Sequence, residues 1–247
     1  MKKLVRRSLY CSLPLLLLST AILLSQPRWL FTLADHLFPG ALYAVLRTDS
    51  QPKVIALTID DGPSSATPKI LNILDRYEAK ATFFNISGNL PSYESTVQQA
   101  VNSGHELGNH LTADEPSIRL SAEAFESDLL AAESALLPYL PTGSKLVWLR
   151  PGMGFYSGDM VDVAQRHGYQ LVLGSTFPYD THVHSARFAS EFILRTVRSG
   201  DIVVLHDGQK KGDNRGARTA ETLELILPDL TRRGYQVTTL SGLVKSP

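Results

Sequence analysis

Residues 54–63 read Val-Ile-Ala-Leu-Thr-Ile-Asp-Asp-Gly-Pro, an apolar run of strand length that ends in two adjacent carboxylates and a turn. Aliphatic and β-branched side chains in so short a run favour a buried strand. Adjacent residues that leave a strand point in different directions, so Asp60 and Asp61 can do different jobs, one facing a substrate and one binding a cation. Taken alone, the four residues that end the run also fit an ordinary polar turn.

Similar short runs follow along the chain and alternate with amphipathic segments, which predicts α/β units around a largely parallel sheet. We expect strands at 54–59, 81–86, 106–108, 146–149, 171–173, 202–205 and 237–240. We expect helices at 68–77, 93–102, 122–137, 158–167, 188–198 and 219–233. Thr67 is the expected cap of the first helix. Glycines that follow helices are expected in the left-handed conformation at Gly104, Gly168, Gly200 and Gly234.

The length and composition favour one catalytic domain behind a short leader. The chain has 247 residues, of which 43% are hydrophobic, enough for one good-sized core. Lys+Arg and Asp+Glu balance at 24 each, so no general positive field favours nucleic acid as a partner. Cys11, the only cysteine, lies near the N-terminus, so any metal must be held by histidines and carboxylates. We expect the domain over 53–247, after a connector over 26–52.

The first 25 residues have the order of an export signal. Four basic residues at positions 2, 3, 6 and 7 precede an apolar stretch over 8–24. As a helix that stretch spans roughly 26 Å, slightly less than the ~30 Å hydrocarbon core. No clear cleavage site follows, and Trp29 beside Arg28 suits an uncleaved anchor. We expect a protein anchored in the membrane by this helix and facing the extracytoplasmic side, or a secreted or periplasmic one if the leader is cleaved.

Three further segments place polar residues where functional groups gather in parallel α/β proteins, at the carboxyl ends of strands. His110 ends one segment, and Asp114 follows it by four residues. Imidazole and carboxylate are the ligands that zinc-like ions take when thiolate is absent. Arg150 enters a Pro-Gly turn and can fix a carboxylate. His206 ends an apolar strand and can move a proton, with Val204 on the same face as an apolar wall.

In this order and spacing, residues 58–63, 104–110, 150–154 and 203–207 resemble the successive motifs of the NodB-homology polysaccharide deacetylases, carbohydrate esterase family four. The resemblance runs from about residue 54 to residue 240. It implies a distorted (β/α) barrel with fewer than eight regular units. It also implies activity on acetylated glycans, either N-acetylglucosamine polymers such as chitin or peptidoglycan or O-acetylated xylan. The implied cofactor is a divalent metal, Zn²⁺ foremost, with Mn²⁺, Co²⁺ and Ni²⁺ as alternatives.

The resemblance implies a role for each residue that matches a motif. Asp60 matches the general base, and Arg150 matches the arginine that orients it. His206 matches the general acid. Asp61 and His110 match metal ligands.

Two further positions follow from the same resemblance. The backbone N–H of Met153 matches a donor to the oxyanion. Val204 stands where a leucine commonly lines the pocket for the acetyl methyl group.

The chain departs from the family pattern at two places. Asp114 replaces the second histidine ligand, and we expect it to complete the metal site because its spacing from His110 is that of the family's two histidines. Residues 177–181 retain only Asp180 of the Asp-x-x-Asp-Trp motif that tunes the acid. The missing tryptophan leaves the substrate groove undefined, and Tyr179 or Phe177 is a candidate for contact with a sugar.

Several alternatives stay open at this stage. The changes at Asp114 and 177–181 also fit a deacetylase-like protein that binds glycan without catalysis. Hydrolysis of a small cyclic amide fits less well with export. A Ser/His/Asp esterase is disfavoured because no Gly-x-Ser-x-Gly elbow occurs. The sequence predicts neither an oligomeric state nor a role for His182 and His184, for which a surface position is expected.

Overall fold

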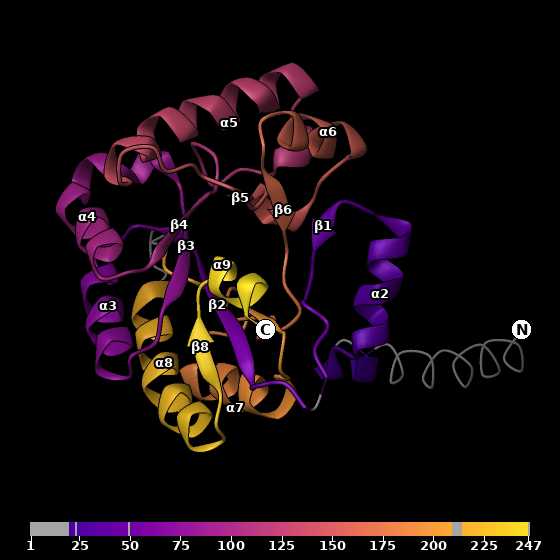
Figure 1. The fold of residues 1–247 in the computed structure, drawn as a ribbon, viewed down its shortest axis with the longest axis vertical. Helices are drawn as coiled ribbons and strands as arrows, with labels where there is room; N and C mark the ends of the chain where they lie inside the picture. The colour runs from indigo at the N-terminus through magenta and orange to yellow at the C-terminus, as the bar shows by residue number, and fades with distance from the viewer. Residues whose placement is uncertain (1–19, 23, 49, 209–213, 247) are drawn as a thin grey trace, which may run out of the picture.

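The computed structural model describes residues 20–22, 24–48, 50–208 and 214–246. Within these residues, eight strands form one sheet in the order β1-β6-β5-β4-β3-β2-β7, with β8 paired to the start of β2. All of the strand pairs are parallel. The sheet curls, and helices surround it (Figure 1).

The elements have the following bounds. The strands are β1 (Ala41–Leu42), β2 (Val54–Gly62), β3 (Ala81–Asn85), β4 (Glu106–Asn109), β5 (Trp148–Leu149), β6 (Gln170–Val172), β7 (Ile202–His206) and β8 (Gln236–Thr238). The helices are α2 (Arg28–Leu37), α3 (Thr67–Arg76), α4 (Glu94–Asn102), α5 (Ala122–Leu136), α6 (Gly158–Arg166), α7 (Ala186–Thr196), α8 (Arg215–Arg232) and α9 (Leu240–Lys245). Short 3₁₀ turns are η1 (Ser87–Ser92), η2 (Ser117–Arg119), η3 (Leu137–Tyr139) and η4 (Gly152–Gly154).

The curled sheet closes through the segment that follows β6. The backbone N–H groups of Ser175 and Thr176 donate to the carbonyl of Ile202 in β7, at 3.0 and 3.1 Å. Val204 N–H in turn donates to the Thr176 carbonyl at 3.0 Å. These bonds join the end of β6 to β7 and complete an irregular barrel. The predicted distorted (β/α) barrel is therefore confirmed.

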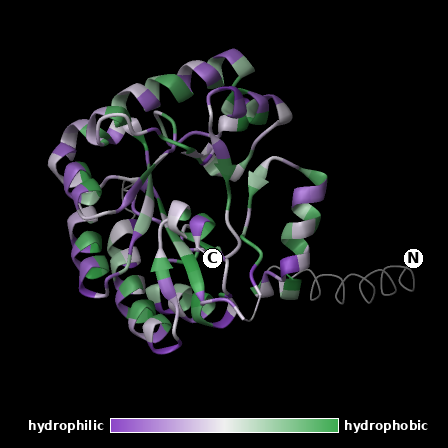
Figure 2. Cartoon of the chain, in the orientation of Figure 1, coloured by the Kyte–Doolittle hydropathy of each residue, from purple (hydrophilic) through white to green (hydrophobic). Residues whose placement is uncertain are grey.

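Side-chain alternation along β2 separates two hydrophobic clusters. Ile55, Leu57 and Ile59 belong to the outer cluster, which lies between the sheet and the helices. Val54 and Ala56 belong to the inner cluster within the barrel, which Leu240 and Leu243 of α9 also join, at the end where β2 begins. In Figure 2 β2 is largely hydrophobic, in keeping with burial on both of its faces. Apolar packing thus fills the barrel at the end where the strands begin. The end where the strands finish is left to polar side chains.

The expected strands and helices are present, with differences at particular ends. The four glycines that follow helices have φ between 78° and 88°, as predicted. The expected cap at Thr67 is wrong, because Ala66 precedes the helix and Thr67 is its first residue. The last long helix begins at Arg215 rather than 219, and the apolar run over 237–240 divides between β8 and α9.

Two elements, α2 and β1, lie in the expected connector over 26–52. β1 pairs with β6, so the connector joins the sheet. The expected anchor over 1–25 lies largely outside the described residues. Among the residues that are described, no helix is long and apolar enough to cross a bilayer.

Candidate active site

The two adjacent carboxylates are separated by an irregularity in β2. Asp60 pairs with Phe84 of β3, but the next pair joins Gly62 to Asn85, so Asp61 is an extra residue in the ladder. Asp61 has a φ of 64°, in the left-handed region. The bulge turns its side chain away from the direction that Asp60 takes into the barrel. This confirms that the two neighbours face different groups.

Arg150 fixes Asp60 from the opposite wall of the barrel. Its Nη1 lies 2.5 Å from Oδ1 of Asp60 and 2.8 Å from Oγ1 of Thr58. Its Nε donates to the carbonyl of Val172 at 3.1 Å, and its Cζ lies 4.2 Å from the ring centroid of Phe84. All these groups are buried, so the arginine and the carboxylate neutralise each other away from water. Asp60 is thereby held in one orientation.

His206 lies beside Asp60 because β2 and β7 pair these two residues directly. Its Nε2 is 4.0 Å from Oδ2 of Asp60. Its Nδ1 is 3.0 and 3.1 Å from the two carboxylate oxygens of Asp180, which also accepts from the His206 backbone N–H at 3.0 Å. Burial alone lowers the pKa of His206, but the charge and hydrogen bond of Asp180, with Asp60, raise it to about 9. The largely shielded His206 ring, whose raised pKa favours its protonated form at neutral pH, therefore faces the Asp60 carboxylate.

Asp61 and His110 form the second pair of the site. Nε2 of His110 lies 3.2 Å from Oδ1 of Asp61, and Nδ1 lies 2.7 Å from the carbonyl oxygen of Arg150. Burial raises the pKa of Asp61, but the hydrogen bond and charge of His110, with His206 and Arg215, bring it below its usual range. Burial likewise lowers the pKa of His110, and the two aspartates raise it above its usual value. Without a cation between them, both shifts favour a charged carboxylate beside a protonated imidazole.

This pair fits a divalent cation. A carbonyl oxygen only accepts, so Nδ1 of His110 carries the hydrogen and Nε2 is directed at Asp61. A bare lone pair there would repel the carboxylate unless a proton or a metal lay between them. Two ligands bonded at about 2.0–2.1 Å in tetrahedral geometry lie roughly 3.3 Å apart, close to the observed 3.2 Å. Metal-ligating histidines typically donate their other ring N–H to such a carbonyl.

A third ligand is not assembled with these two. Within the described residues, no group of three or more His, Cys, Asp or Glu side chains is placed to hold a metal. Asp114 is half-buried in the loop that follows β4. In this loop the carbonyls of Leu111 and Thr112 accept hydrogen bonds from the backbone N–H groups of Ser87 and Gly88. In this structure Asp114 therefore does not stand with Asp61 and His110.

The other predicted residues lie on three different segments. Met153 lies in η4 with a φ of 60°. Its neighbour Gly152 lies so close to the loop that a Cβ on it would come within 2.1 Å of the Glu115 carbonyl oxygen. Val204 is buried on β7, two residues before His206 and therefore on the same face of the strand. Tyr179 packs edge-on against Phe177 and Phe192, with ring centroids 5.4 and 5.6 Å apart.

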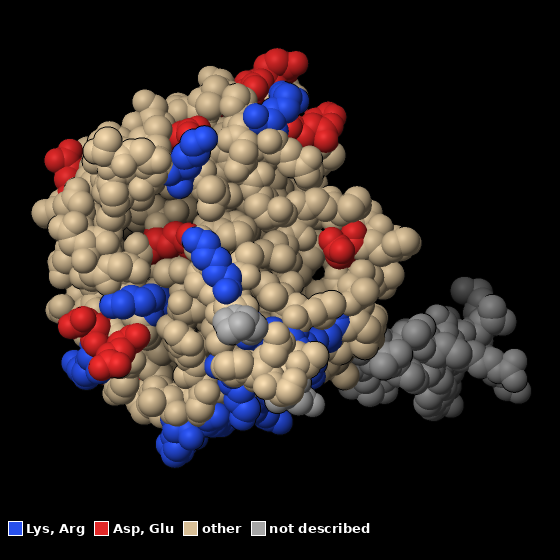
Figure 3. All heavy atoms as spheres, in the orientation of Figure 1, with Lys and Arg blue, Asp and Glu red and all other residues tan. Residues whose placement is uncertain are grey.

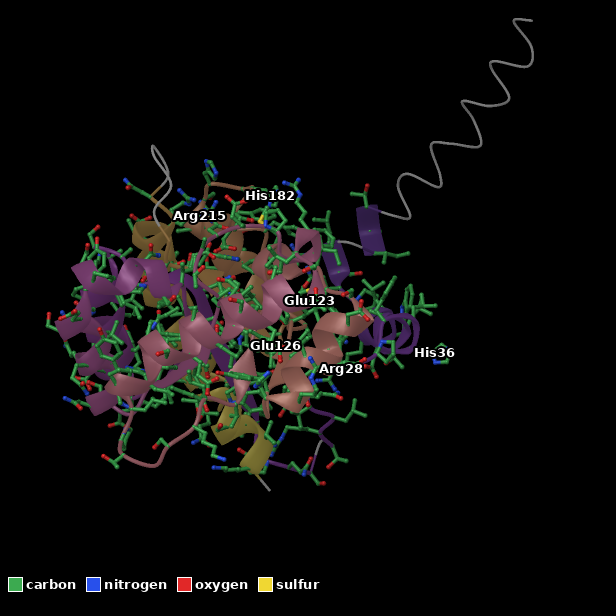
Figure 4. The ribbon with its side chains drawn as sticks, turned by 90° about the horizontal axis from the view of Figure 1, so that it is seen from above. Arg28, His36, Glu123, Glu126, His182 and Arg215 are labelled. Carbon is green, nitrogen blue, oxygen red and sulfur yellow. The ribbon has the colours of Figure 1, made fainter. Side chains whose placement is uncertain are left out.

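One contributor escaped the sequence analysis, and the predicted aromatic segment supplies another. Arg215, at the first position of α8, places Nη1 2.9 Å from Oδ2 of Asp61. Phe177 places its ring edge-on to His206, with centroids 5.8 Å apart. Figure 4 shows Arg215 at the same edge of the molecule as His182, whose Nδ1 lies 2.8 Å from Oγ1 of Thr181. An isolated arginine after a loop carries no local pattern that would have identified it.

The chain is similar to known proteins over most of its length. A sequence profile described as polysaccharide deacetylase matches residues 47–172, about half of the chain. This chain belongs to the polysaccharide deacetylase family. It is 32% identical over 206 residues to a peptidoglycan-N-acetylglucosamine deacetylase of Bacillus cereus, covering 82% of this chain and 93% of that one.

Two further similarities also extend over most of this chain. The chain is 28% identical over 213 residues to a chitooligosaccharide deacetylase of Bradyrhizobium sp., covering 82% of this chain and 97% of that one. The crystal structure of the Bc1960 peptidoglycan N-acetylglucosamine deacetylase superimposes with a TM-score of 0.76 at 23% identity, over 87% of this chain and 96% of that chain. At that identity the superposition shows the shared fold.

Proposed function

We propose that this polysaccharide deacetylase hydrolyses the N-acetyl groups of N-acetylglucosamine units in peptidoglycan or a chitin-like glycan. The observation that carries the proposal is that Oδ2 of Asp60 lies 4.0 Å from Nε2 of His206. Arg150 holds Asp60, and Asp180 holds His206. A carboxylate base beside a protonated imidazole is the arrangement that amide hydrolysis needs, because an amine leaves poorly unless it is protonated.

In the proposed reaction, Asp60 accepts a proton from the water that attacks the acetyl carbonyl carbon. Arg150 orients the carboxylate, and the Met153 N–H donates to the oxyanion that forms. The carbon–nitrogen bond then breaks as His206 gives its Nε2 proton to the departing amine. The products are acetate and a free amino sugar.

Asp61 and His110 would hold the divalent metal, with Asp114 as the proposed third ligand. When bound there, the metal would polarise the acetyl carbonyl as a Lewis acid. Two carboxylates in the ligand set would leave the site less positive than one carboxylate with two imidazoles. Such a set favours harder ions such as Mn²⁺ beside Zn²⁺.

We propose that the reaction takes place outside the cytoplasmic membrane. The basic residues and apolar stretch within residues 1–25 support export and anchoring, because they have the order of a signal anchor. Polymeric glycans of the proposed kind lie on that side of the membrane. Fractionation of cells tests the location directly: the anchored protein stays with membranes and keeps its leader, whereas a soluble form starting near residue 26 contradicts anchoring.

The substrate is tested by measuring acetate release from peptidoglycan, chitooligosaccharides and acetylated xylan, with and without a chelator. We expect release from one or both N-acetylated glycans and its loss on chelation. Release from xylan alone would identify an O-acetyl esterase instead. A folded protein that binds a glycan without releasing acetate would identify the non-catalytic alternative.

A further inference from the structure

The helix α2 presents large apolar side chains to solvent. Trp29, Leu33 and Leu37 follow one another at intervals of four residues and therefore lie on one face, and Phe38 follows at its end. Their exposed fractions are 54%, 44%, 59% and 61% in that order. No residue of α2 is buried. A helix with such a face is stable in an interface between water and an apolar phase, because each side chain there costs free energy in water.

The opposite face of α2 is attached to the barrel. Arg28 donates to the carbonyl of Ser199 and lies 3.5 Å from Asp201. The ring of Phe31 packs 6.1 Å from that of Tyr43. These contacts fix the helix so that Trp29, Leu33 and Leu37 face away from the body. In Figure 1 α2 lies outside the ring of helices, and in Figure 3 the surface over it is mostly neither acidic nor basic.

We propose that the outer face of α2, defined as Trp29, Leu33, Leu37 and Phe38, lies in the interfacial layer of a lipid bilayer. This inference rests on the anchoring included in the proposed function. The apolar stretch over 8–24 ends three residues before α2 begins, so an anchor of that length brings α2 to the membrane surface. A tryptophan with aliphatic neighbours on one helical face is the composition that binds this layer.

The same attachment places the catalytic centre near the membrane. Gln26, just before α2, donates its side-chain N–H to the Phe177 carbonyl at 2.8 Å and accepts from the Phe177 N–H at 3.0 Å. Phe177 in turn contacts the ring of His206. Residues at the membrane-proximal end of the chain therefore touch the loop beside the acid. Glycan strands next to the membrane are the substrates that this placement favours.

The test uses the full chain in vesicles of phosphatidylethanolamine and phosphatidylglycerol whose acyl chains carry bromine, which quenches tryptophan fluorescence at short range. The chain has two tryptophans, and Trp148 is buried in the barrel. We expect a blue-shifted Trp29 emission that the brominated lipid quenches strongly. Trp29→Phe should remove the quenched component and leave the Trp148 emission unchanged.

A matched pair of substitutions locates the contact. Leu33→Lys with Leu37→Lys should abolish most of the quenching of Trp29, whereas Leu46→Lys, at a still more exposed leucine outside α2, should leave it intact. Flotation of the vesicles reports separately on anchoring. Flotation with an unquenched Trp29 overturns the inference and leaves the anchor standing. A blue-shifted but unquenched Trp29 means that protein, rather than lipid, covers the face, and also overturns it.

Discussion

Nη1 of Arg215 lies 2.9 Å from Oδ2 of Asp61, while Oδ1 of the same carboxylate faces Nε2 of His110 at 3.2 Å. The Arg215 guanidinium thus binds the same carboxylate that is proposed to bind the metal. Both side chains are largely shielded from solvent, so the pair is screened less than a surface ion pair. Metal binding must either tolerate this neighbouring positive charge or displace it.

Replacing Arg215 with alanine should therefore increase metal affinity. Removing the competing cation frees Oδ2 of Asp61, and we expect a roughly tenfold lower Kd for Mn²⁺ or Zn²⁺, equivalent to about 1.4 kcal/mol. Calorimetric titration of metal-free protein with Mn²⁺ or Zn²⁺ measures this Kd. Arg187→Ala, which removes an exposed arginine that pairs with Glu191, is the control and should leave the Kd unchanged. An unchanged or higher Kd for Arg215→Ala would show that Arg215 does not compete.

If His206 is the acid, as proposed, its pKa should set an upper pH limit for the reaction. The acid works only when protonated, so kcat/KM should fall as pH rises through about 9. Asp180→Asn removes the charge that raises this pKa, so the fall should move to lower pH. Asp35→Asn, an exposed aspartate on α2, is the control. A pH profile that Asp180→Asn leaves in place would exclude Asp180 as the residue that tunes the acid.

Arg150 should matter for folding as well as for turnover. Arg150→Ala leaves the buried carboxylate of Asp60 without its partner, and breaking a buried pair in this way costs about 3–5 kcal/mol of unfolding free energy. Denaturant titration measures the loss. Adding Asp60→Asn to Arg150→Ala removes the uncompensated charge, so the double variant should recover part of the stability. No recovery in the double variant would show that Asp60 is not the charge that Arg150 compensates.

Asp114 is the predicted ligand that the structure does not bring to the pair. Its spacing from His110 still predicts that it binds the metal, and we expect Asp114→Ala to lose metal and Asp114→His to retain it. Metal analysis of the purified variants decides the matter. Full occupancy in Asp114→Ala would remove Asp114 from the ligand set.

Much of the barrel could be predicted because local patterns determine it. Buried strands, left-handed glycines and polar residues at strand ends are each readable in a short window, as the run over 54–63 shows. The register that sets His206 opposite Asp60 follows from two such strands lying side by side.

What escaped prediction depends on contacts between distant segments. Arg215 reaches Asp61 across 154 residues, and Gln26 reaches Phe177 across 151. Neither residue stands in a pattern of its own. The expected strand over 237–240 includes Leu240, which instead begins α9, because a short apolar run fits either structure until its neighbours are known.

The central claim is that Asp60 and His206 act as base and acid on an N-acetylated glycan. Its most direct test is the rate of acetate release from chitooligosaccharides or peptidoglycan by the wild type, Asp60→Asn and His206→Ala, each with metal content and folding verified. We predict release by the wild type and a loss of roughly 10²-fold or more in each variant, with fold and bound metal retained. Near-normal turnover in either folded, metal-loaded variant would contradict the assignment.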